Sequence, residues 1–170
     1  MWYNYTSQYI YLHRRGIFMD DTEKRKAAKQ YLMELRYMSE RIGELEKDIE
    51  AHRNRLILPA RPLRERVSGS RMSDMFEQKM AESLDKQLQH DELVFKYLLK
   101  RDEIVMQILE IEEPMHARLL YEMFCKFKNM TDAAKCTGIS RQYASHEITS
   151  ALVTFYNLWL AHLERKEVLS

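Results

Sequence analysis

Apolar residues recur at alternating intervals of three and four between residues 28 and 56, and this spacing is the strongest constraint that the sequence places on the fold. The series extends over about four heptads, and His52 is its one polar member. It consists of Ala28, Tyr31, Leu35, Met38, Ile42, Leu45, Ile49, His52 and Leu56. A sustained heptad pattern predicts a long helix that packs on a partner helix, either within the chain or across a dimer. We therefore expect one helix from Thr22 to about Leu56.

A second long helix is predicted after a break in this pattern. The chain has only 3 prolines and 4 glycines, and Pro59, Pro62 and Gly69 lie close together after the first helix. The second helix is expected from Ser73, with Asp74 in its first turn, to about Glu113. Its apolar stripe is predicted to be Met80, Leu84 and Leu88 and, after a change of phase near His90, Val94, Tyr97, Ile104, Ile108 and Ile111. Two long helices and a short connector predict an antiparallel, coiled-coil-like hairpin.

The connector between these helices, residues 57–73, lies in the most basic part of the chain. Residues 53–71 contain six arginines and one glutamate. Arginine suits phosphate geometry, so one interpretation is a phosphate-binding loop. The other is a solvated connector whose arginines pair with the acidic helices beside it. The candidate phosphate contacts are Arg61, Arg64, Arg66 and Arg71, together with Lys128 and Lys135 further along the chain.

The C-terminal part has the spacing of a helix-turn-helix. Pro114 fits the first position of a supporting helix, and Asn129 can close that helix. Thr131 is expected to cap the next helix, in which Ala134 allows a close helix crossing. Gly138 can adopt the left-handed conformation that reverses the chain, and Ser140 can cap the following helix. That last helix is predicted from Ser140 to about Leu163, and its apolar stripe is Ala144, Ile148, Ala151, Phe155 and Trp159.

Polar residues remain on the outward face at the start of this last helix. Arginine can bind guanine through two hydrogen bonds, glutamine can pair with adenine, and hydroxyl and imidazole groups can contact bases or phosphates. The functional interpretation is a recognition helix spanning residues 140–156, and the alternative is a turn between two core helices of an ordinary bundle. The candidate DNA contacts are Thr131, Ser140, Arg141, Gln142, Tyr143, Ser145, His146 and Thr149.

Several classes of function lack their usual sequence signals. Cys125 and Cys136 do not have the paired spacing of a zinc site, and Glu113 with His116 forms only one Glu-x-x-His pair, whereas a di-iron site needs more. No nucleophile motif or phosphate-cradling glycine loop is found. We therefore expect no enzyme activity, no metal and no cofactor. No apolar run approaches the ~18 residues of a membrane span, and we expect a cytoplasmic protein with reduced cysteines.

The predicted fold is all-α, with three parts along the chain. Residues 1–21 form a leader that is aromatic-rich and has no acidic residue before Asp20, and Met19 is an alternative start. We expect this leader to be flexible, with a partner-binding arm as the alternative. Residues 22–113 form the hairpin, and residues 114–170 form the helix-turn-helix bundle. The 27 basic and 26 acidic residues nearly balance, so any DNA affinity must come from local patches.

The order of these segments resembles a known family. A long helix contains YLMELRYMSERIGELEKDIE, a connector contains RVSGS, and the C-terminal part contains RLLYEMFCKFKNMTDAAKCTGIS. The chain resembles, over about residues 22–160, the RinA and ArpU late transcriptional activators of phages and prophages. The C-terminal part of that family is similar to region 4 of RNA polymerase sigma factors.

The resemblance implies which residues act on DNA. Arg141, Gln142, Ser145 and His146 match the base-contacting face, and residues 132–134 match the start of the first helix of the motif. Sigma-type helices often carry several basic residues, whereas Arg141 is the only arginine or lysine between Ser140 and Tyr156. The resemblance therefore implies help from a dimer, from the arginine connector or from RNA polymerase.

Three functions follow as hypotheses. The first is a phage-type transcriptional regulator, expected to be an activator, that binds double-stranded DNA and forms a homo-oligomer through its long helices. The second is a structural or interaction protein in which the C-terminal helices only complete a core. The third is a small subunit for DNA packaging, which also joins a helix-turn-helix to an oligomerising coil.

Overall fold

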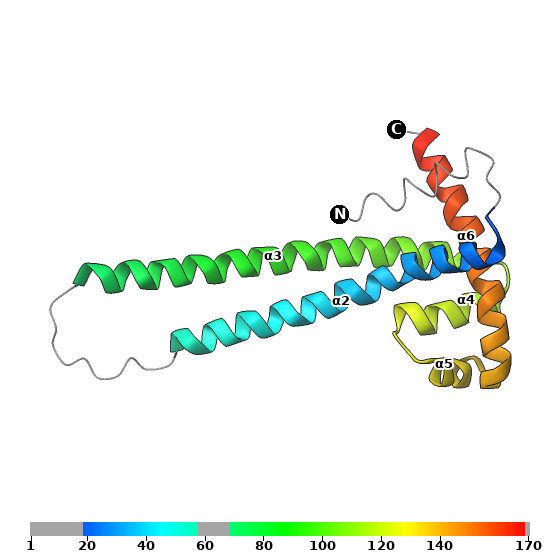
Figure 1. Cartoon of the computed structure of the whole chain (residues 1–170), viewed down its shortest axis with the longest axis horizontal. Coiled ribbons are helices and arrows are strands. Elements are labelled where there is room, and N and C mark those ends of the chain that lie inside the picture. The colour runs from blue at the N-terminus through cyan, green and yellow to red at the C-terminus, as the bar shows by residue number, and fades with distance from the viewer. Residues whose placement is uncertain (1–18, 58–68, 169–170) are drawn as a thin grey trace. The chain divides into compact units, whose positions relative to one another are not determined.

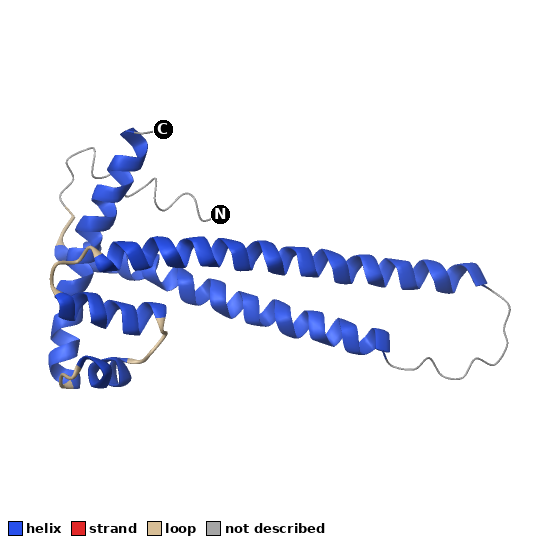
Figure 2. Ribbon diagram, turned by 180° about the vertical axis from the view of Figure 1, so that it is seen from behind, coloured by secondary structure: helices blue, strands red, loops and turns tan. Residues whose placement is uncertain are grey.

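The computed structural model describes residues 19–57 and 69–168. The described residues form helices and short connections and contain no strand, which confirms the predicted all-α class (Figure 2). The predicted leader up to residue 18 lies outside the described residues. None of the described helices is long and apolar enough to cross a membrane.

The order of the helices follows the prediction (Figure 1). The two long helices are α2, Asp21–Ile57, and α3, Gly69–Leu109. The helix α3 begins four residues before the predicted start at Ser73. The shorter helices that follow are α4, Pro114–Leu120, the π-helical η1, Tyr121–Cys125, α5, Met130–Thr137, and α6, Arg141–Val168.

Two compact units share the long helices. Of the described residues, one unit comprises 37–57 and 69–99, and the other comprises 19–36 with 100–168. The predicted boundary between the hairpin domain and the helix-turn-helix domain lies at residue 113. The two compact units instead divide within the long helices, between residues 36 and 37 and between residues 99 and 100. The physical reason is that the N-terminal part of α2 and the C-terminal part of α3 both contact α6. Tyr31 of α2 stacks on Trp159, and Glu103 of α3 forms an ion pair with Lys166.

Within the unit of residues 37–99, α2 and α3 are antiparallel neighbours. The His52 Nε2 atom lies 2.7 Å from the Lys86 Nζ atom, and Arg53 donates a hydrogen bond of 3.3 Å to Gln87. Further along, the His90 Nε2 atom lies 3.5 Å from a carboxylate oxygen of Glu46. From the His52–Lys86 pair to the Glu46–His90 pair, the contacts move toward the start of α2 and toward the end of α3, as an antiparallel pair requires. Leu45 and Ile49 of the predicted heptad are buried there.

One part of the predicted stripe on α3 is wrong. Met80, Leu84 and Leu88 were expected to face α2, but their side chains are 49, 62 and 60% exposed. In the same part of α3, Lys86, Gln87 and His90 make polar contacts with α2. Beyond the change of phase near His90, by contrast, the predicted Ile104, Ile108 and Ile111 are buried.

The other unit has an aromatic core. Tyr31 of α2 stacks on Trp159 of α6, with ring centroids 4.5 Å apart, and lies 6.0 Å from the ring of Phe155. Burial raises the pKa of Tyr31 well above its ordinary range. The Lys100 ammonium lies 3.8 Å from the Tyr31 ring centroid and 3.0 Å from a Glu34 carboxylate oxygen. The predicted apolar stripe of α6 is confirmed, since Ala144, Ile148, Ala151, Phe155 and Trp159 are all buried.

The supporting helix of this unit changes its winding before it ends. After α4, the backbone N–H of Lys126 donates to the carbonyl of Tyr121, a hydrogen bond over five residues that defines the π-turn η1. Phe127 then takes a left-handed conformation, with φ of 55°. This residue ends the helix, so the expectation that Asn129 closes it is wrong. The π-turn leaves Leu119, Leu120 and Phe124 buried against the neighbouring helices.

Candidate nucleic-acid interface

The turn between α5 and α6 has the predicted backbone geometry. Gly138 is left-handed, with φ of 76°, and the N–H of Ile139 donates to the carbonyl of Ala134. A side chain at Gly138 would be strained by this φ even though the surrounding space is open. The Ser140 hydroxyl accepts a 3.1 Å hydrogen bond from the N–H of Tyr143, which confirms its capping role. Ala134 and Ala144 are buried, which lets α5 and α6 approach closely.

The cap of α5 differs from the prediction. The helix begins at Met130, and the cap is Asn129, whose side-chain oxygen accepts a 2.9 Å hydrogen bond from the N–H of Asp132. The Asn129 amide also donates to the Asp132 carboxylate over 2.8 Å. Thr131 lies inside the first turn, so its predicted capping role is wrong. The sequence allowed both positions, because threonine and asparagine are both good caps.

Replacing the cap should weaken this helix measurably. We expect Asn129→Ala to lower the free energy of unfolding by about 1 kcal/mol, because it leaves backbone donors of α5 without their acceptor. Thr131→Ala is the matched control and should change stability by less than about 0.5 kcal/mol. Urea unfolding followed by circular dichroism measures both. A larger loss from Thr131→Ala than from Asn129→Ala would contradict this assignment of the cap.

The first two turns of α6 present a polar surface. Arg141, Gln142, Ser145 and His146 are exposed, whereas Ala144 and Ile148 on the opposite side of the same turns are buried. Among the described residues, Arg141 and Gln142 make no side-chain hydrogen bond or ion pair. Thr149 is half-buried and donates its hydroxyl to the carbonyl of His146 over 2.6 Å. Four of the predicted DNA contacts therefore share one accessible face.

A group of side chains that was not predicted lies on the other flank of α6. The Nε2 atom of His116, on α4, is 2.9 Å from a carboxylate oxygen of Glu147, and these side chains are only 13 and 16% exposed. Tyr143, one helical turn before Glu147, also hydrogen-bonds to this carboxylate, whose charge raises the pKa of Tyr143. The His146 Nδ1 atom lies 3.5 Å from the second carboxylate oxygen. Glu147 therefore anchors α6 to α4 and restrains two candidate DNA contacts.

Spacing within the sequence could not reveal this group, since His116 and Glu147 are 31 residues apart. The His116 side chain appeared only as half of an incomplete di-iron pattern with Glu113. In the structure, Glu113 is exposed and precedes the first turn of α4, and His116 is turned to Glu147. The part of the chain that the structure describes contains no group of three or more metal-ligating side chains.

The Glu147 pair should make stability depend on pH. The hydrogen bond from His116 lowers the pKa of Glu147 below its ordinary value of 4.5. Its stabilising contribution is therefore complete above pH 4.5 and is lost as the pH falls through the lowered pKa. We expect Glu147→Gln to be less stable than the wild type at pH 7 and to lose less stability on acidification. Thermal unfolding between pH 7 and 3 measures this difference, and an unchanged slope in the variant would contradict it.

The predicted phosphate contacts differ in how firmly other protein groups already hold their side chains. Lys135 is exposed and lies 3.8 Å from the Asp132 carboxylate. Lys128 is held by Glu122 at 2.6 Å and by the Cys136 sulfur at 3.0 Å, and these contacts raise its pKa. A phosphate would have to compete with Glu122 for Lys128. The arginines at positions 61, 64 and 66 lie outside the described residues, as does the side chain of Arg71.

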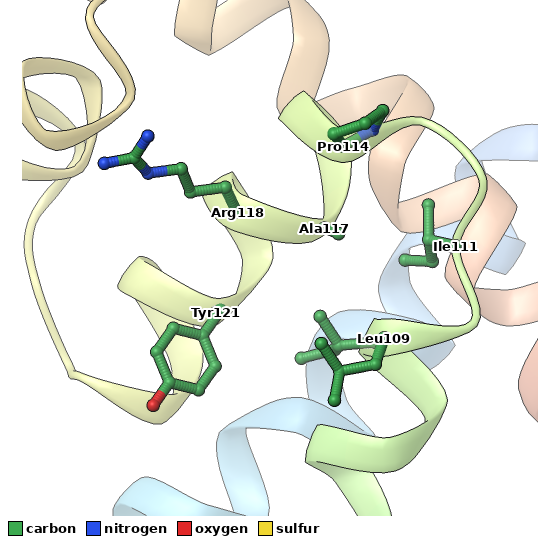
Figure 3. A pocket seen from close by; sticks show the side chains of 7 residues that line it. Leu109, Ile111, Pro114, Ala117, Arg118 and Tyr121 are labelled. Atoms are coloured by element: carbon green, nitrogen blue, oxygen red, sulfur yellow. The ribbon is translucent and has the colours of Figure 1, made fainter.

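An open pocket lies away from this polar surface. It has a volume of about 460 Å³ and is lined by the end of α3, α4 and the start of η1, without residues of α5 or α6. Figure 3 shows Leu109 and Ile111 on one side of the pocket and Arg118 and Tyr121 on the other. Its lining is mainly apolar, so it does not extend the polar face of α6. None of the predicted DNA contacts lies in it.

The geometry thus supplies a short helix, a tight turn and a longer helix whose first turns expose hydrogen-bonding groups. Comparisons give no further guide, because no family model and no curated protein matches the sequence and no solved structure matches the fold. What remains is the surface chemistry of α6. That chemistry is hydrogen bonding to a partner through a guanidinium, an amide, a hydroxyl and an imidazole, with little positive charge to draw the partner in.

Proposed function

We propose that this chain is a DNA-binding transcriptional regulator whose α6 reads double-stranded DNA in the major groove. The proposal rests on one observation, which is that the first turns of α6 have an exposed polar side and a buried apolar side. Arg141, Gln142, Ser145 and His146 are exposed on one side, and Ala144 and Ile148 anchor the other. The major groove of B-DNA admits an α-helix and presents a distinct donor and acceptor pattern for each base pair.

The side chains of this region are suited either to contacts with bases or to contacts with phosphates. Arg141 has two parallel donors for the O6 and N7 atoms of guanine, and Gln142 can pair with the N6 and N7 atoms of adenine. Neither side chain has to give up a protein hydrogen bond to do so. Lys135, near the end of α5, can contact a phosphate and help to fix the orientation of the motif. Ser140 is already engaged as the cap of α6, so its role would be indirect.

The biological setting of the proposal rests on the family resemblance. A late activator of phages or prophages would act in the cytoplasm of the bacterial host, with RNA polymerase as a further partner. The first turns of α6 support specificity better than affinity, because Arg141 is the only arginine or lysine between Ser140 and Tyr156. Additional phosphate contacts would be needed, and the arginine-rich connector of residues 57–73 is our candidate for them.

Selection of binding sites from a random double-stranded DNA library tests this function. The full chain would be used at about 50 and 200 mM salt, a range over which purely electrostatic binding falls steeply. We expect one sequence to be enriched at the lower salt concentration and to remain enriched at the higher one. Uniform binding that disappears at higher salt, or no binding at all, would overturn the proposal and favour a role in protein interaction.

A further inference from the structure

The outward face of α3 between residues 80 and 99 is unusually apolar for a surface. Six large apolar side chains between these two positions are between 47 and 62% exposed. We call this set the outer stripe, and it consists of Met80, Leu84, Leu88, Phe95, Leu98 and Leu99. Their spacing of mostly three or four residues places them on one side of α3, opposite the side that contacts α2. The sequence prediction had assigned the first three to the buried side.

We propose that the outer stripe is the contact through which two copies of this chain pair, with α3 of one copy packed along α3 of the other. The proposal goes beyond the DNA-binding function and does not depend on it. The heptad on α2 is a different surface: within the chain, its member His52 contacts Lys86 of α3 and its member Tyr31 stacks on Trp159 of α6.

The small core of this unit supports pairing. Among residues 37–54 and 77–99, whose side chains the structure describes, Leu45 and Ile49 are the only buried ones. Two helices that bury so little side-chain surface gain little stability from their own packing. Pairing through the outer stripe would place α3 between α2 of the same copy and α3 of the second copy. This unit would then have a second apolar contact in addition to the one around Leu45 and Ile49.

The exposed area agrees with what a dimer needs. Six side chains of this size at half to two-thirds exposure present on the order of 600 Å² per copy, or about 1,200 Å² in a pair, which reaches the lower end of the range for specific interfaces. An apolar patch of this size on a monomer commonly marks an interaction site. The heptad-like spacing favours another long helix with a similar stripe. On α2, the exposed large apolar residue is Tyr37 alone among the described residues, so α3 of a second copy is the matching surface.

The charges beside the stripe are largely compensated within the chain. The Asp91 carboxylate is 3.0 Å from the His90 Nδ1 atom and accepts a 3.1 Å hydrogen bond from Gln87, both of which lie toward α2. Glu92 is paired with Lys96 at 2.5 Å. The two acidic residues nearest the centre of the stripe are thus turned to partners in the same helix. A second copy can therefore approach without bringing these two carboxylates together unpaired. A basic partner protein would gain little here, because the negative charges of Asp91 and Glu92 already have partners within α3.

Sedimentation equilibrium of the full chain over a hundredfold range of concentration tests the proposal. We expect the wild-type mass to rise toward twice that of one chain. Leu84→Glu with Leu88→Glu should weaken this association at least tenfold, because it places charge in the contact. Phe95→Glu is an independent second variant with the same expectation. Tyr37→Glu on α2 removes an equally exposed apolar side chain outside the stripe and should leave the association unchanged.

Circular dichroism separates loss of pairing from loss of folding. The substituted side chains are exposed in the single chain, so the variants should keep their helix content at low protein concentration. A wild-type chain that stays monomeric over the whole concentration range would overturn the proposal. It would indicate that the outer stripe binds a different protein. Undiminished association of both stripe variants, or assembly into a ring larger than a dimer, would overturn it as well.

Discussion

A chain carrying Arg141→Ala together with Gln142→Ala should lose sequence-specific DNA binding while keeping its fold. Each bidentate contact with the correct base contributes about 1–3 kcal/mol, so removing both should weaken specific binding by about 2–6 kcal/mol. Both side chains are exposed and have no side-chain partner in the described part of the chain. Their removal should therefore leave the packing of α6 unchanged. Binding is measured by fluorescence anisotropy with the enriched site and with a scrambled duplex.

The same helix provides a matched control for this variant. Asn157→Ala with Arg165→Ala also removes one amide and one guanidinium from exposed positions of α6, but further along the helix than the proposed contacts. This control should retain the affinity of the wild type for the enriched site. If both double variants bind equally well, α6 does not read DNA through its first turns. Equal weakening of both would instead indicate that charge alone attracts DNA.

The largest loss of stability is expected from Phe155→Ala. Phe155 is fully buried in α6, and its ring lies 6.0 Å from that of Tyr31 in the core formed with α2. Truncating a buried phenylalanine removes apolar contacts and leaves a cavity, which typically costs 3–5 kcal/mol, and we expect about this loss. Urea unfolding followed by circular dichroism and by the fluorescence of the neighbouring Trp159 measures it at a fixed protein concentration.

The control for this prediction is an aromatic side chain outside the core. Tyr37→Ala shortens a residue of α2 that is 51% exposed, and it should change the free energy of unfolding by less than about 0.5 kcal/mol. Such a contrast would establish the cluster of Tyr31, Phe155 and Trp159 as the main anchor between α2 and α6. A loss below about 1 kcal/mol in Phe155→Ala would contradict the packing of this core.

Much of the local structure could be predicted because its causes are local. Gly138 ends α5 in the left-handed conformation, Ser140 caps α6, and the apolar stripe of α6 is buried as its periodicity indicated. The prediction failed where two nearby residues could do the same task. Asn129 can end one helix or start the next, and Thr131 competes with it as a cap, so the sequence did not determine which one caps α5.

The sequence by itself determined that this chain is helical, where its helices break and which polar residues lie at the start of α6. These properties follow from backbone preferences and from periodicity along one helix. Only the tertiary structure decided that the stripe from Met80 to Leu88 turns away from α2. It also decided that His116 holds Glu147 against α4. The physical reason is that a periodic pattern places residues on a common face, but the direction of that face depends on which other helices pack beside it.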